Sequence, residues 1–258
     1  MVAVLALGLS FLVATAAYRA GALTRDGAVA AVLVGTLVLF GAGWGGAALL
    51  AVFFVSSTLV GRIALARGKA ADPAGERRNA RQVLANGAAA AVGALIERQS
   101  PGLGLWIVCG ALAAAAADTW ATSIGAFSRT DPRHLLDGRR VPKGASGGVS
   151  PLGTLGAMAG AAIVAVSGGL AGGGVPLLIA GISIGFGGML LDSLLGASLQ
   201  GRFECPRCAV ATECRLHRCG TPAGLVGGLK WLDNDGVNAF STGLAALAAA
   251  GAWWAWAR

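Results

Sequence analysis

Long apolar stretches alternate with short charged segments along almost the whole chain. A bilayer core about 30 Å thick needs about 20 apolar residues per helix, and we find eight runs of roughly that size, bounded by charged residues or by Pro and Gly. The runs are Val2–Ala17, Gly27–Phe40, Trp44–Arg62, Ala80–Ile96, Gly102–Phe127, Ser150–Ser167, Val175–Gln200 and Val237–Trp256. The pattern predicts an all-α, polytopic transmembrane helix bundle of about eight helices, with a range of seven to nine.

Composition supports a membrane protein over a soluble one. The 258 residues are 55% hydrophobic and 12% charged and include 42 glycines, whereas a soluble domain is about 25% charged. Ala and Gly allow helix backbones to approach closely in lipid. We therefore expect one integral membrane domain, residues 1–258, that contains a Cys-rich cytoplasmic loop at residues 201–236.

Positive charge predicts the orientation of the bundle, because cytoplasmic loops retain Lys and Arg. The segments after the first, third, fifth and seventh runs hold 18 of the 20 Lys and Arg residues, and only Arg98 and Arg258 fall on the other side. This bias predicts that both termini lie outside and the four charged loops inside. The membrane is expected to be a bacterial inner (cytoplasmic) membrane. The bias also explains the net charge of +8. The charge is therefore no argument for nucleic-acid binding. The first run lacks a basic segment before it and is expected to be a retained span.

Two apolar runs contain a carboxylate well inside them, Asp118 in 102–127 and Asp192 in 175–200. Insertion of such a residue costs about 2.5 to 3.5 kcal/mol, so it persists mainly where it has a partner or a task. Both runs cross the membrane in the same direction, and each acid precedes the cytoplasmic end by about two turns. The acids should therefore lie level with each other. Asp118-Thr119 and Asp192-Ser193 hint at duplicated helical hairpins, and a salt bridge to Arg81 is the alternative to a site.

A glycine-rich segment leads directly into the run at 150–167. Backbone N–H groups at a helix N-terminus, bare glycines, hydroxyls and cations together form a cradle for an anion such as phosphate. A plain Gly-rich turn is the alternative, because the spacing differs from the standard P-loop. The candidate residues are Arg139, Lys143, Gly144, Ser146, Gly147, Gly148 and Ser150.

Oxygen-bearing side chains also gather before the last run, where Mg²⁺ ligands would be expected. Mg²⁺ is commonly held by one or two carboxylates together with substrate phosphates, and a solvated acidic turn is the alternative. Arg81 and Asn86 share a similar helix face and are further candidates, against simple anchoring at the membrane boundary. The candidates just before and at the start of the last run are Lys230, Asp233, Asn234, Asp235 and Asn238.

The Cys-rich loop offers soft ligands for a metal ion. Four ligands drawn from Cys205, Cys208, Cys214, His217 and Cys219 suit a tetrahedral, structural Zn²⁺ site. The favoured set is Cys205, Cys208, His217 and Cys219, although the His-x-Cys half is tight. Free thiols are the alternative, because a disulfide is disfavoured on a reducing cytoplasmic face.

Four motifs carry a resemblance to a known family: 117–122 (ADTWAT), 147–150 (GGVS), 191–197 (LDSLLGA) and 234–238 (NDGVN). The chain resembles the family that contains transmembrane protein 19 and the plant phytyl-phosphate kinase. The likeness extends over nearly the whole chain, including 24–36 and 53–57.

The resemblance implies a membrane-bound, Mg²⁺-dependent kinase of prenyl monophosphates. Such an enzyme transfers the γ-phosphate of a nucleoside triphosphate, with CTP as one candidate donor, to phytyl, geranylgeranyl or polyprenyl phosphate. Phosphoryl transfer needs mainly positioning and charge neutralisation. We expect Asp118 and Asp192 to bind Mg²⁺ with Asp233 or Asp235 nearby. The Lys143 side chain and the amides of 144–150 would hold the donor, and Arg81 or Arg139 would neutralise the acceptor.

Two other functions remain open at this point. A lipid-phosphate cytidylyltransferase would use the same apparatus to direct attack to the α-phosphate. An ion-coupled transporter would use the buried acids to bind a coupling ion, but it predicts polar residues across the membrane. The polar motifs lie on one side, which favours an enzyme whose site faces the cytoplasm. The sequence leaves open the oligomeric state, a dimer included, and the preferred nucleotide and lipid.

Overall fold

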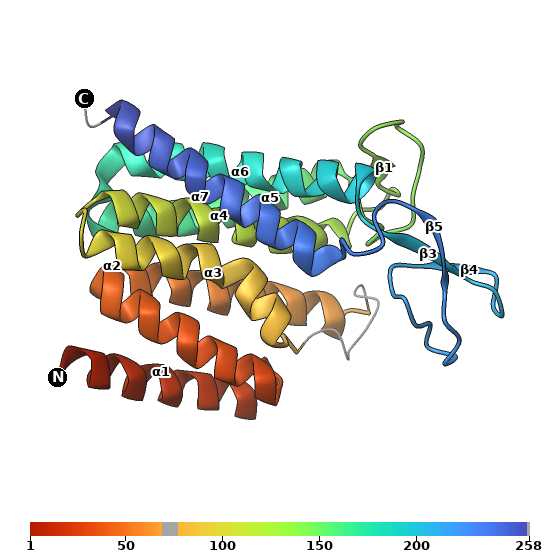
Figure 1. The fold of residues 1–258 in the computed structure, drawn as a ribbon. Coiled ribbons are helices and arrows are strands. Elements are labelled where there is room, and N and C mark those ends of the chain that lie inside the picture. The colour runs from red at the N-terminus through yellow and green to blue at the C-terminus, as the bar shows by residue number, and fades with distance from the viewer. Residues whose placement is uncertain (69–76, 257–258) are drawn as a thin grey trace.

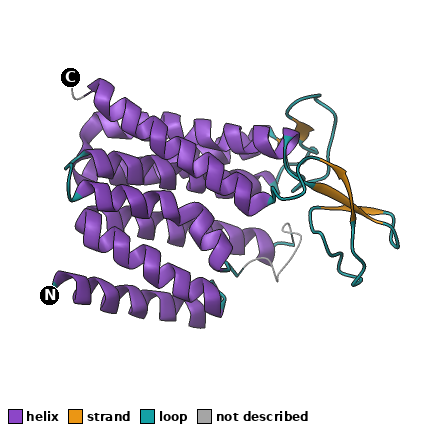
Figure 2. Cartoon of the chain, in the orientation of Figure 1, coloured by secondary structure: helices purple, strands orange, loops and turns teal. Residues whose placement is uncertain are grey.

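The computed structural model describes residues 1–68 and 77–256, and almost all of the regular structure is helical (Figures 1 and 2). The helices are α1 (Val2–Arg19), α2 (Arg25–Ala66), α3 (Ala80–Glu97), α4 (Leu103–Gly125), α5 (Pro151–Gly168), the π-helical turn η2 (Gly169–Gly173), α6 (Gly174–Ser198) and α7 (Asn234–Trp256). Of the residues counted in the charge pattern, Lys69 and Arg258 lie outside the described residues.

The expected count of about eight helices is wrong for continuous helical runs, of which the described residues contain six. The expected segments 27–40 and 44–62 both belong to α2, and α5 and α6 are continuous through η2. Glycines explain the merging, because Gly43 and Gly172 adopt non-helical, positive-φ conformations that kink a run without ending it. Each expected apolar segment nevertheless falls largely within a helix.

Four of these runs are long and apolar enough to cross a membrane, by length and composition only. They are Val2–Arg19, Arg25–Ala66, Leu103–Gly125 and Pro151–Ser198. Many large apolar side chains are exposed on the outside of the bundle, including Leu5, Phe11 and Leu247. Such a surface would be unfavourable in water and matches the hydrocarbon of a bilayer.

Helix α4 occupies the centre of the bundle, and its first fifteen residues, from Leu103 to Ala117, are almost entirely buried. Small residues allow its neighbours to approach it. A Cβ atom added to Gly185 of α6 would lie 2.8 Å from the Cβ of Ala113 in α4. The expected Ala/Gly-rich packing is therefore present at the central helix contact.

The two chain ends lie at one end of the bundle, and the longer loops lie at the other (Figure 1). The loops carry two small antiparallel sheets. One pairs β1 (Arg133–His134) with β2 (Gly148–Val149). The other has the order β4 (Val210–Thr212), β3 (Arg202–Cys205) and β5 (Gly224–Gly227). This arrangement gathers the polar segments of the chain at a single end, while the side of the membrane on which they lie stays a prediction.

Candidate functional site

A polar cavity of about 390 Å³ lies at the loop end of the bundle. Side chains from α2 to α7 and from the glycine-rich segment line it, and we call it the polar cavity. The sequence-predicted residues that line it are Asn86, Asp118, Lys143, Gly144, Ser146, Gly147, Gly148, Ser150, Asp192, Asn234 and Asn238. Residues more than 100 positions apart in the sequence are thus brought to one place.

The carboxylates of Asp118 in α4 and Asp192 in α6 both line this cavity. A Cβ on Gly188 of α6 would lie 2.5 Å from the Cβ of Ala114 in α4, so the helices are in close contact one turn before Asp192 and Asp118. The two acids lie close enough for their charges to interact. Among residues 1–68 and 77–256, neither forms a salt bridge with Lys, Arg or His. The alternative to a site, a salt bridge to Arg81, is therefore absent from the described residues.

The hydroxyl groups near the acids differ in what they contact. Ser241 of α7 donates a hydrogen bond of 2.9 Å to the Asp192 carboxylate. Thr119 donates to the backbone carbonyl of Ala115 at 2.9 Å, and the Ser193 hydroxyl lies 3.7 Å from the Met189 sulfur. Thr119 thus satisfies a helix carbonyl, and Ser241, which sequence reasoning did not select, orients Asp192.

The glycine-rich segment packs against the end of α6. Gly147 has a φ of +76°, and a Cβ there would lie 2.5 Å from the Cβ of Ala197, so the position requires glycine. The amide and the hydroxyl of Ser146 both donate to Glu213, at 3.2 and 2.7 Å. A carboxylate from the Cys-rich loop therefore occupies the donors that were predicted to receive phosphate.

The N-terminus of α5 points its first residues at the same cavity. Ser150 is the N-cap, and its hydroxyl accepts a hydrogen bond from the Gly153 amide at 3.1 Å. The Lys143 ammonium donates to the carbonyls of Ala126 and Ser128 just after α4 ends. The positive end of the α5 dipole and the Lys143 charge both favour an anion in the cavity.

Five predicted residues lie outside the polar cavity. Arg81 pairs with Asp233 at 2.6 Å and with Asp235 at 3.6 Å. The Gly236 amide and Arg81 lower the pKa of Asp233 although partial burial, the largest effect, opposes them. Arg139 pairs with Asp137 at 3.1 Å, and Lys230 is exposed. Arg81 thus joins the start of α3 to the start of α7, whereas Arg139 pairs within its own loop.

Arg78 lines the polar cavity, and sequence reasoning missed it. Its backbone is held on both sides, because its amide donates to Ala22 at 3.0 Å and its carbonyl accepts from the Thr24 amide at 3.1 Å. The guanidinium lies over the rings of Phe53 and Phe54, and no carboxylate of the described residues pairs with it. Burial lowers its pKa to about 10, which leaves it charged at neutral pH.

An apolar cavity of about 380 Å³ adjoins the polar one. It lies among the first three helices and is lined mostly by aliphatic side chains and Phe53 and Phe54. Arg78, Gln82 and Asn86 line both cavities. A polar and an apolar space therefore share three polar lining residues, an arrangement that suits a molecule with an anionic head and an apolar tail.

Ser57 adds an unsatisfied donor to the polar cavity. It is 1% exposed, and its hydroxyl has no hydrogen-bond partner among the described residues. A buried hydroxyl without a partner costs free energy, so such groups in native proteins usually meet water or a ligand. The family resemblance extends over 53–57, but no site residue was predicted in this stretch.

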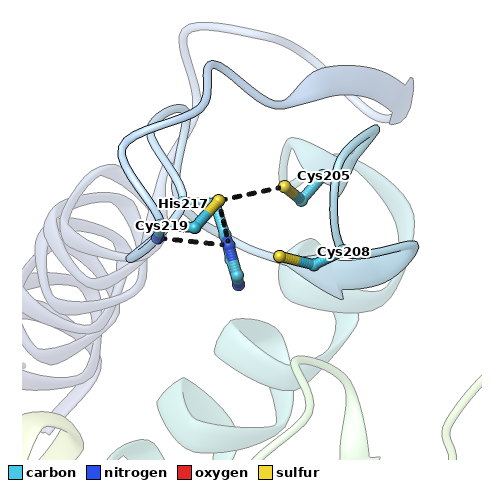
Figure 3. Close-up of side chains that lie close together, drawn as sticks. All are labelled: Cys205, Cys208, His217 and Cys219. Carbon is cyan, nitrogen blue, oxygen red and sulfur yellow. Dashed lines mark hydrogen bonds between the residues drawn. The ribbon is translucent and has the colours of Figure 1, made fainter.

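The four predicted zinc ligands come together in the Cys-rich loop (Figure 3). One ligand atom from each of Cys205, Cys208, His217 and Cys219 lies within 4.8 Å of the others. The cluster could bind a metal ion such as Zn²⁺. Two of the five cysteines lie outside the cluster: Cys109 is buried in α4, and Cys214 is exposed.

Comparisons with known proteins agree on a membrane family. Residues 8–246 match the family described as integral membrane protein DUF92. Protein PGR of Arabidopsis thaliana is 30% identical over 260 residues, which cover 89% of this chain and 88% of that protein. An uncharacterized membrane protein of Methanocaldococcus jannaschii is 29% identical over 178 residues, 69% of this chain and 75% of its own. No solved structure matches the chain.

Proposed function

The chain belongs to the DUF92 family of integral membrane proteins, and on that premise we propose that it is a prenyl-phosphate kinase. The enzyme transfers the γ-phosphate of a nucleoside triphosphate to a prenyl monophosphate such as phytyl, geranylgeranyl or polyprenyl phosphate. CTP is the candidate donor that the family resemblance suggests. The products are a prenyl diphosphate and a nucleoside diphosphate.

The observation that carries this proposal is that Arg78, Gln82 and Asn86 line both the polar and the apolar cavity. A prenyl phosphate has a long apolar tail and a compact anionic head, and the apolar and polar cavities offer one space for each. Arg78 lies where they meet, with its guanidinium free of any carboxylate partner among the described residues. A planar guanidinium can hold two oxygens of a phosphate at once, which would fix the head at the boundary.

The residues around the acids fit a divalent cation. Asp118 and Asp192 supply carboxylate oxygens without a cationic partner, and the neighbouring Asn238 supplies an amide. Hard oxygen ligands of this kind suit Mg²⁺. When bound, Mg²⁺ would neutralise the negative charge on the phosphate oxygens. Ser241 would keep the Asp192 carboxylate oriented through its hydrogen bond of 2.9 Å.

The donor phosphates would bind along the glycine-rich segment that lines the polar cavity. The amides of Ser146 and Gly147, the N-terminus of α5 and the Lys143 ammonium all favour an anion there. Glu213 now accepts the Ser146 hydrogen bonds. Donor binding would therefore displace the Glu213 carboxylate, and the Ser146 amide would then donate to a phosphate oxygen.

The reaction requires no strong base, because the acceptor is already ionised. An oxygen of the prenyl phosphate attacks the γ-phosphorus, and the bond between the γ-phosphorus and the bridging β-oxygen breaks. The electron pair leaves with the nucleoside diphosphate. Arg78 would reduce repulsion between the two phosphates, and the Lys143 charge would stabilise the leaving group. Positioning and charge neutralisation are the main requirements for phosphoryl transfer.

A product assay tests the proposal. The purified, detergent-solubilised protein is incubated with geranylgeranyl or phytyl phosphate, Mg²⁺ and each of the four common nucleoside triphosphates labelled at the γ-position. Label in the lipid diphosphate is the expected result. Labelled pyrophosphate together with a CDP-lipid would instead identify a cytidylyltransferase. Absence of turnover with every donor, in protein shown to be folded, would contradict both.

A further inference from the structure

The Cys-rich loop buries too little apolar surface to account for its own fold. Between residues 206 and 222 no residue is buried, whereas Phe203 and Cys205 just before this stretch are. A small segment without a core usually needs a disulfide or a metal ion to hold one conformation. All five cysteines of the chain are free. Because no disulfide holds the loop, a metal ion is the remaining candidate.

Two tight turns direct the four ligands to one point. In the first, the Ala209 amide donates to the Cys205 carbonyl at 2.8 Å, and Ala209 has a positive φ of 52°. In the second, the Gly220 amide donates to the His217 carbonyl at 2.9 Å, and Gly220 has a φ of 78°. A non-glycine residue at positive φ is strained and persists where its surroundings impose the conformation.

The separations between the ligand atoms match a tetrahedral site. The sulfur atoms of Cys205 and Cys219 are 3.6 Å apart, and His217 Nδ1 is 3.1 Å from the Cys219 sulfur (Figure 3). Zinc bonds of about 2.3 Å to sulfur place two tetrahedral sulfurs about 3.8 Å apart. The cluster is therefore close to the geometry of a bound ion.

The same loop reaches the polar cavity through Glu213, which lies between the two pairs of ligands in the sequence. Its carboxylate accepts hydrogen bonds from Ser146 at 2.7 and 3.2 Å and from the Gln200 side chain at 2.9 Å. We infer that Cys205, Cys208, His217 and Cys219 bind one Zn²⁺ ion, and that this ion holds the loop so that Glu213 lies at the mouth of the polar cavity. The inference does not depend on the proposed function.

The first test is metal content. We expect the full-length protein, purified without added metal, to contain about one zinc ion per chain, the stoichiometry of a Cys₃His site. Replacing zinc with Co²⁺ should produce the intense visible absorption of tetrahedral cobalt thiolates. Cys208→Ser and His217→Ala should lose the metal, whereas Cys214→Ser, a substitution in the same loop outside the cluster, should keep it. Zinc-free wild-type protein with a Cys205–Cys219 disulfide would overturn the inference.

The second test asks whether zinc holds the loop in place. Chelation of the wild-type protein should accelerate tryptic cleavage after Arg207, Arg215 and Arg218 by about tenfold or more, because local opening becomes easier. Cleavage within 129–140 serves as the internal control and should change little, and added zinc should restore protection. Equal cleavage rates with and without bound zinc would contradict the role of the ion, whatever the catalytic activity.

Discussion

Gly188 of α6 lies so close to Ala114 of α4 that a Cβ on the glycine would approach the alanine Cβ to 2.5 Å. The same helices carry Asp192 and Asp118 four residues later, which is about one turn. The small-residue contact therefore sets the separation at which the two carboxylates line the polar cavity. Helix packing and the candidate chemistry depend on each other at this point.

Enlarging Gly188 should separate the acids. We expect Gly188→Ala to destabilise the protein by about 1 to 3 kcal/mol, the usual cost of overpacking a core contact, and to lower activity. Thermal unfolding in detergent measures the stability change. Gly187→Ala is the control, because a Cβ there meets nothing within 4 Å. The double variant Ala114→Gly/Gly188→Ala should recover stability, and failure to recover would show that another contact is responsible.

Arg78 should determine affinity for the lipid phosphate. Hydrogen bonds to charged groups contribute about 1.5 to 3 kcal/mol, so we expect Arg78→Ala to raise the KM for the prenyl phosphate by about tenfold to a hundredfold. The KM for the nucleotide should change much less. Arg77→Ala replaces the preceding, exposed arginine and should have little effect. Equal effects of the two variants would argue against Arg78 as the phosphate ligand.

The apolar cavity should determine which tails are accepted. Ala47 lines this cavity, and a phenylalanine there would fill part of it. Ala47→Phe should raise the KM for geranylgeranyl phosphate about tenfold, through the loss of roughly 1.4 kcal/mol of tail binding, and leave that for isopentenyl phosphate nearly unchanged. Val29→Phe, on an exposed part of α2 outside both cavities, is the control. If the Ala47 variant had the same KM as wild type for both acceptors, the tail would have to bind elsewhere.

Much of the site could be predicted because its residues differ in type from the sequence around them. Asp118 and Asp192 stand out inside apolar runs, and the periodicity of α4 and α6 places them level with each other. The glycines of 144–148 stand out between cations. Spacing favoured Cys205, Cys208, His217 and Cys219 among the five Cys and His residues of the loop, and the structure brings these four together.

Other features depend on tertiary packing that spacing does not reveal. Sequence reasoning selected Arg81 and missed Arg78, whose backbone bonds to the α1–α2 turn place it at the cavity. Arg81 instead meets Asp233, 152 positions away. The helix count was wrong because Gly43 and Gly172 each allow two expected segments to continue as one run.

The central claim is that the polar cavity transfers phosphate to a lipid with the help of its two acids. The most direct measurement compares wild type, Asp118→Asn and Asp192→Asn for γ-label transfer to geranylgeranyl phosphate at saturating Mg²⁺. We predict lipid diphosphate from wild type and a loss of about a hundredfold or more in each variant, the usual scale for removing a group that stabilises transition-state charge. Folded variants that turn over at the wild-type rate, or a wild type that transfers no label, would contradict the account.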